Sequence, residues 1–138
     1  MLALHMFLAI DRLRRDAPDH DRLIRRLQEV FFEHLDAALR EMGVGDLSVG
    51  RKIRGLAEAF YGRICAYERA IAAEDGSLAA ALARNVIGSE DPKKAAPLAA
   101  YVMAARGALF RRPIVELDAA FRDLGGDTAL LHGEAPDE

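Results

Sequence analysis

The sequence contains little of the chemistry on which small enzymes and secreted domains depend. It has one cysteine, Cys65, no tryptophan, and 7% aromatic residues in 138. A single cysteine excludes an internal disulfide framework and fits a reducing compartment. The sequence has no GxSxG, HExxH, P-loop or dinucleotide motif, and no two of its four histidines share a helical i, i+3 or i+4 spacing. We therefore predict no catalytic residues, no metal site and no cofactor.

Long apolar runs are also missing. Residues 1–10 are apolar apart from His5, and arginines follow them, which reverses the charge order of a secretory signal. This segment and residues 98–110 are both shorter than the ~20 residues that cross a bilayer. We predict a cytoplasmic protein that is not secreted, has no transmembrane segment, and could contact the inner membrane only from its surface.

Charge of either sign is nearly balanced. The formal net charge is −3 and the isoelectric point is near 5.8, so no overall field attracts nucleic acid, and we expect no specific DNA binding. From Asp123 onward the chain has five acidic residues and no lysine or arginine. We predict one helical domain over residues 1–125 and an acidic, disordered tail over residues 126–138.

Alanine and leucine supply most of the apolar content, which favours helix over sheet. Apolar residues recur at spacings of three and four, and the breaks between them predict about six helices, at 2–15, 19–42, 46–73, 77–86, 92–110 and 113–125. We predict a single compact all-α domain with a long central third helix. Expected end signals are Gly43, Ser77 and Asp91. Expected core positions include Leu2, Met6, Leu23, Leu27, Phe31, His34, Leu56, Phe60, Ile64, Tyr67, Leu78, Val86, Val102 and Leu109.

The third predicted helix also carries a ridge of small residues, at Gly55, Ala59, Gly62 and Ala66. Each glycine inside a helix costs about 1 kcal/mol relative to alanine. Two of them predict a packing reason, namely the close approach of another backbone.

A basic cluster opens the same helix, at Arg51, Lys52 and Arg54. The first turn of a helix prefers anions, so this placement indicates either an acidic partner, RNA or anionic lipid, or a solvated face. Further along, Tyr61 lies outside the predicted core stripe and beside Arg63. This pair fits either a helix–helix contact or the border of a groove.

Several segments, in this order and spacing, carry a resemblance to a known family. They are Leu4-His5, Arg12-Leu13-Arg14, Leu39–Val44, Ala57–Arg63 and Ala81–Val86. From about Leu4 to Val86 the chain resembles the ubiquinol–cytochrome c chaperone family, and a bacterial member fits best. Members of the family usually carry more chain before the Leu-His pair, whereas this sequence starts almost at it.

The resemblance implies a function that the residues alone do not. The family's mitochondrial members are assembly factors for the cytochrome bc1 complex, not enzymes. They bind newly made cytochrome b and work with a small partner protein near the ribosome and the membrane. We therefore expect an assembly chaperone for cytochrome b or another bc1 subunit, with a small co-chaperone and contact with ribosome or membrane surface as further candidates.

We expect the client groove to lie beside the third helix. The residues predicted at its edges are Arg51, Lys52, Arg54, Tyr61, Arg63 and Tyr67. The alternative is a ribosome- or nucleic-acid-binding helical module that uses the basic start of the third helix.

Overall fold

Every element in the part of the chain that the structure describes is helical. The computed structural model describes residues 1–15 and 20–127. Its α-helices are α1 (Leu2–Arg15), α2 (Asp21–Glu41), α3 (Asp46–Ala73), α4 (Ser77–Leu82), α5 (Ala96–Phe110) and α6 (Leu117–Asp127). A π-helical turn at Ala83–Ile87 and 3-10 turns at Pro92–Ala95 and Ile114–Glu116 connect the last three. The predicted all-α class is confirmed.

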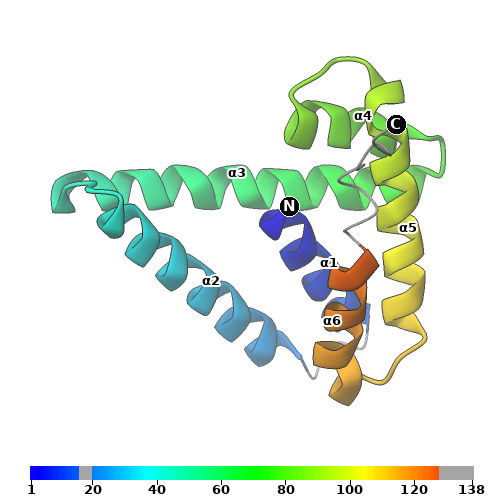
Figure 1. Ribbon diagram of the computed structural model, residues 1–138, viewed down its shortest axis with the longest axis horizontal. Helices are drawn as coiled ribbons and strands as arrows, with labels where there is room; N and C mark the ends of the chain where they lie inside the picture. The colour runs from blue at the N-terminus through cyan, green and yellow to red at the C-terminus, as the bar shows by residue number, and fades with distance from the viewer. Residues whose placement is uncertain (16–19, 128–138) are drawn as a thin grey trace, which may run out of the picture.

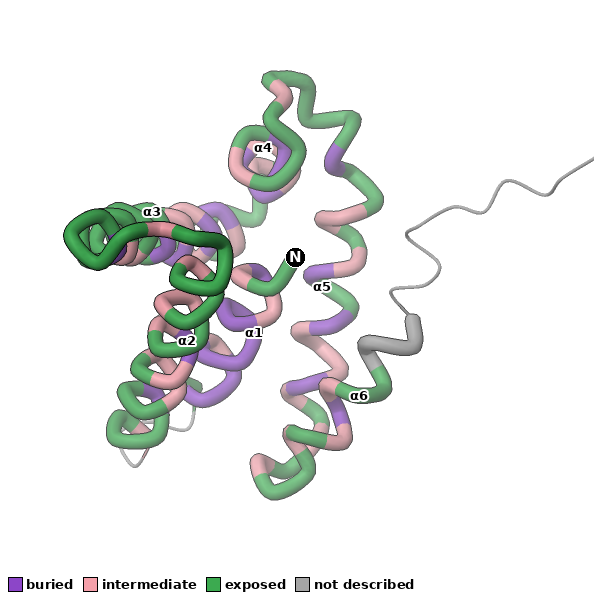
Figure 2. The backbone as a smooth tube through the Cα atoms, turned by 60° about the vertical axis from the view of Figure 1, so that its left-hand side comes forward, coloured by how far each residue is buried: buried purple, intermediate pink, exposed green. Residues whose placement is uncertain are grey.

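The most deeply buried element is α1, which lies among the other helices (Figure 1). It packs against α2 and α5, and the ring of Phe7 meets that of Tyr67 on α3 at 5.4 Å between centroids. Figure 2 shows burial on most sides of α1, and Phe7, Leu8, Ile10 and Leu13 are each at most 1% exposed. The broad apolar surface of this segment is explained by the three helices that cover it.

Most of the predicted core positions are confirmed, but not all. Leu23 is 48% exposed, and its neighbour Ile24 is buried instead. His34 is exposed as well, because α2 buries only a narrow stripe centred on Ile24 and Phe31. Three other predicted core residues are exposed: Leu2, Leu56 and Val86.

The predicted close approach at the small-residue ridge is wrong. Gly55, Ala59 and Gly62 are exposed, and a Cβ added at either glycine meets no heavy atom within 4 Å. The ridge faces away from the core because it lies on the opposite side of α3 from Val49, Phe60 and Ile64. No neighbouring helix therefore compensates for these glycines in the described chain.

The ends of the helices follow their local signals in part. Gly43 ends α2 with φ at +86°, and the carboxylate of Asp91 accepts a hydrogen bond from the Lys93 amide at 3.0 Å, as predicted. Ser77 is not the cap of α4, since the carboxylate of Asp75 accepts a hydrogen bond from the Ser77 amide instead. Hydrogen bonding from the Ser77 side chain, and less strongly from its amide, lowers the pKa of Asp75.

Two other predicted ends differ. The fourth helix was expected to reach Val86, but α4 ends at Leu82 and the chain continues as a π-helical turn. The last helix was expected to end at Gly125, whereas α6 extends to Asp127. Of the predicted acidic tail, residues 128–138 lie outside the described residues.

One charged residue belongs to the core. Arg12 is 5% exposed, and its guanidinium donates hydrogen bonds to the carbonyl oxygens of Leu109 and Arg112, each at 3.0 Å. The Leu109 carbonyl lies in the last turn of α5, and Arg112 follows two residues after the helix ends. Arg12 therefore fastens α1 to the C-terminal end of α5.

Candidate protein-binding groove

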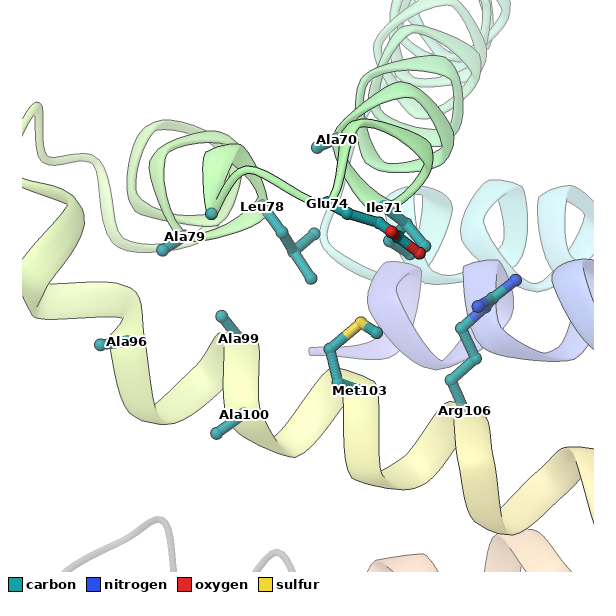
Figure 3. A pocket seen from close by; sticks show the side chains of 11 residues that line it. Ala70, Ile71, Glu74, Leu78, Ala79, Ala96, Ala99, Ala100, Met103 and Arg106 are labelled. Atoms are coloured by element: carbon teal, nitrogen blue, oxygen red, sulfur yellow. The ribbon is translucent and has the colours of Figure 1, made fainter.

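An apolar groove of about 560 Å³ lies where the end of α3, the start of α4 and the middle of α5 meet. Figure 3 shows side chains from all three helices around it. It is lined mainly by small and aliphatic residues: Ala70, Ile71, Glu74, Gly76, Leu78, Ala79, Ala96, Ala99, Ala100, Met103 and Arg106. We call it the alanine groove.

The sequence forms this groove by reversing direction and then using short side chains. Glu74 and Gly76 have φ at +52° and +80°, so the chain turns sharply after α3 and brings α4 beside α5. The alanines of α4 and α5 leave the space between the helices open. Leu78 is buried at the floor, while Met103 is 47% exposed and points into the open space (Figure 3).

The charged groups at the groove lie at its margin. Arg106 donates to the carboxylate of Asp11 at 2.8 Å and stacks on the ring of Phe110, with its guanidinium carbon 4.5 Å from the centroid. Its charge is thus largely compensated, and the groove surface is apolar. No thiol, imidazole or hydroxyl is among the lining residues. Such a largely apolar surface binds apolar side chains.

A second, smaller hollow of about 250 Å³ lies on the other half of α3, beside the start of α1 and the end of α2. Leu2 and Leu56, which are 63% and 42% exposed, form part of its rim, and Arg63 supplies its charge. Its other lining residues are Met1, Ala3, Phe31, Leu35, Ala59 and Phe60.

The structure separates the six residues that were predicted to border one groove. Arg63 lines the second hollow, whereas Tyr61 is 44% exposed on another side of α3 and packs against Phe32. Tyr67 is not at an edge, because it is 3% exposed within the core. That burial raises the pKa of the Tyr67 hydroxyl, and the charge of Arg63 lowers it by less.

The basic cluster forms a surface of its own. Arg51, Lys52 and Arg54 are exposed near the turn between α2 and α3. Along α3, Lys52 and Tyr67 are about 22 Å apart at the rise of an α-helix. The cluster therefore does not border the alanine groove, which lies at the opposite end of α3.

The alanine groove was not predicted. Its signal in the sequence is the density of alanines in 79–83 and 95–105, which by itself indicates only helix. Short alanine side chains on two facing helices also predict an open space between those helices. Which helices face each other becomes known only in the folded structure, where α4 lies beside α5.

The described residues contain no cluster of three or more histidine, cysteine, aspartate or glutamate side chains arranged to hold a metal ion. Among these same residues, no helix combines the length and the apolarity that a membrane crossing requires.

The fold and the groove define an all-helical protein with an apolar surface formed by three helices. Comparison with known proteins gives the family. The model of the family described as ubiquinol-cytochrome C chaperone matches residues 1–121, and the chain belongs to that family.

A solved structure shares the fold. The chain is similar to the crystal structure of the Cbp3 homolog from Brucella abortus, with a TM-score of 0.70 and 38% identity over 86% of this chain and 67% of that one. The resemblance deduced from the sequence is confirmed by both findings.

Vertebrate proteins named ubiquinol-cytochrome-c reductase complex assembly factor 1 are also similar. The Xenopus laevis protein is 28% identical over 95% of this chain and the Homo sapiens protein 27% over the same share. The chain spans 60% of the Xenopus protein and 40% of the human protein. These similarities give no support to the alternative of a ribosome- or nucleic-acid-binding module.

Proposed function

We propose that this chain is a non-enzymatic assembly chaperone for the cytochrome bc1 complex and that its client is newly made cytochrome b. Its family and the names of its relatives support the assembly role. The alanine groove is the observation that carries the binding mode, because it is an apolar surface that is open to solvent. We further infer that the protein works in the cytoplasm, peripheral to the inner membrane.

The groove fits one side of an apolar helix. An unassembled membrane helix exposes aliphatic side chains that need cover until its partner subunits arrive. Alanine-rich walls allow the backbone of a second helix to approach closely, and Met103 is a flexible side chain that adapts to irregular partners. Docking of a helix into a groove of this kind is a common mode of peptide recognition.

The predicted edge residues remain part of the proposal in a different arrangement. Arg63 lines the second hollow, which we propose as the site of a small co-chaperone, and Tyr61 lies on another side of α3. Tyr67 acts only indirectly, by holding α3 against α1.

The test is affinity capture of the tagged protein from its own cells in mild detergent, followed by mass spectrometry. Met103→Glu puts a carboxylate in the groove, and Ala104→Glu puts one on the same helix at an exposed position that does not line it. Burial of an unpaired carboxylate against an apolar client reduces binding by about tenfold or more.

We expect cytochrome b to be enriched with the wild-type and Ala104→Glu proteins and strongly depleted with Met103→Glu. Equal enrichment with both variants would show that the groove is not the binding surface. Absence of cytochrome b, or recovery of ribosomal proteins alone that are lost at high salt, would contradict the proposed client.

A further inference from the structure

The turn between α2 and α3 carries two large apolar side chains that the fold leaves in solvent. Leu47 is 96% exposed and Met42 is 71% exposed. In Figure 1 this turn is the far tip of the angle formed by the two longest helices, away from α4 and α5. We call residues 40–54 the apex.

The exposure of these side chains is fixed by the backbone. The Val44 amide donates to the Leu39 carbonyl at 3.0 Å, which closes the end of α2. Val49 is fully buried, and Leu47, two residues earlier on the helix, points about 200° away from it. Leu47 therefore cannot turn inward without unwinding the first turn of α3.

An ion-pair bridge also holds the apex together. Arg40 on α2 pairs with Asp36 on the same helix and with Asp46, the first residue of α3. The hydrogen bond that Arg40 donates to the Asp36 carboxylate is the main reason that the pKa of Arg40 is raised. The two helices thus meet in a defined turn rather than a loose loop.

The apex is basic although the whole chain is acidic. Residues 40–54 contain four basic and two acidic side chains, which gives them a net charge of +2, whereas the chain carries −3. Arg40 already has its partners, and the structure gives Arg51, Lys52 and Arg54 no ion pair within the described residues. These three exposed cations are available to an anionic surface beside Leu47 and Met42.

We propose that the apex docks on an anionic phospholipid bilayer. Leu47 and Met42 enter the boundary between headgroups and acyl chains, and Arg51, Lys52 and Arg54 lie at the level of the lipid phosphates. RNA would explain the cations, but it offers no apolar phase for Leu47 and Met42. This inference deepens the peripheral location proposed above and names the surface that produces it.

The apex and the alanine groove can be tested separately. Leu47 and Ile71, one in each surface, are about 36 Å apart along α3 at the rise of an α-helix. A substitution in one surface therefore leaves the other unchanged.

The absence of tryptophan from the chain provides a direct probe. Leu47→Trp places the only indole at the apex, and Val115→Trp places it at another apolar residue that is 90% exposed. We expect vesicles of phosphatidylcholine with phosphatidylglycerol to shift the emission of Leu47→Trp to shorter wavelength and to leave Val115→Trp unchanged. Phosphatidylcholine alone should give a much smaller shift.

Flotation of the full chain with the same vesicles measures the fraction of protein bound to lipid without a label. Leu47→Asp should reduce the bound fraction by about tenfold or more, since it removes the apolar anchor, whereas Val115→Asp should not. Each basic residue of the cluster changed to glutamine should reduce binding by about fivefold. Circular dichroism checks that the variants are folded, as expected for exposed positions.

Several outcomes would contradict docking of the apex on lipid. Equal emission shifts at residues 47 and 115, or wild-type flotation by Leu47→Asp, would overturn the inference. So would RNA binding that survives Leu47→Asp in a protein that does not float. If the protein floats with vesicles but does not capture cytochrome b, the proposed client is contradicted and the lipid-docking surface is not. If the protein captures cytochrome b but does not float, the lipid-docking surface is contradicted and the proposed client is not.

Discussion

Replacement of Arg12 by methionine tests how the core is held together. The change removes two charge-assisted hydrogen bonds to the carbonyls of Leu109 and Arg112. Such bonds contribute about 1.5–3 kcal/mol each, and the removal of a buried guanidinium returns part of that by relieving its desolvation. We expect a net loss of about 3 kcal/mol in the free energy of unfolding, or about 10 °C in Tm for a chain of this size.

The measurement is urea denaturation of the purified variants with the slope checked for two-state behaviour. Arg14→Met is the matched control, since Arg14 lies two residues away on α1 and pairs with Glu68 at the surface. Exposed pairs contribute about 0–1 kcal/mol. If Arg12→Met and Arg14→Met cost the same within about 1 kcal/mol, the fastening of α1 to α5 by Arg12 is refuted.

Three further predictions follow from local geometry. Gly62→Ala should raise the free energy of unfolding by about 1 kcal/mol, because the added Cβ has no heavy atom within 4 Å. Gly43→Ala should lower the free energy of unfolding, because φ is +86° at that residue. Thermal melting of the two variants compares these effects. The pKa of Asp75 is lowered in the fold, so the stability that its carboxylate contributes is present above its unfolded pKa near 4 and is lost as the pH falls below that. Asp75→Asn should therefore flatten the acid limb of a curve of stability against pH. An unchanged acid limb would contradict this prediction. The pKa of Tyr67 is raised in the fold, so the stability that its neutral hydroxyl contributes is complete below about pH 10 and is lost as the pH rises further. Tyr67→Phe should remove this loss of stability at alkaline pH.

Local signals in the sequence predicted the helices and several of their ends. Gly43 and Asp91 act through their own backbone and side chain, so their roles do not depend on distant residues. The same holds for the period of apolar residues that produced the all-α class. Where several neighbours compete for one role, as Asp75 and Ser77 do at the start of α4, the local pattern was insufficient.

The burial of particular faces was harder to predict. The choice between Leu23 and Ile24 depends on the direction from which α1 meets α2, and a helical period cannot fix that direction to within one residue. The prediction that another helix lies close to the glycine ridge of α3 failed for the same reason. Its small residues permit a close approach, but no helix of the described chain occupies that side.

The candidate surfaces divide in the same way. The sequence by itself determined the helical class, the order of the helices, the family resemblance and the basic cluster at Arg51, since each depends on residues that are neighbours in the chain. The tertiary structure alone decided that Arg12 serves α5 and that alanines from three helices face one groove. Those outcomes depend on contacts between residues up to about 100 positions apart, whose free energies appear only when the helices pack.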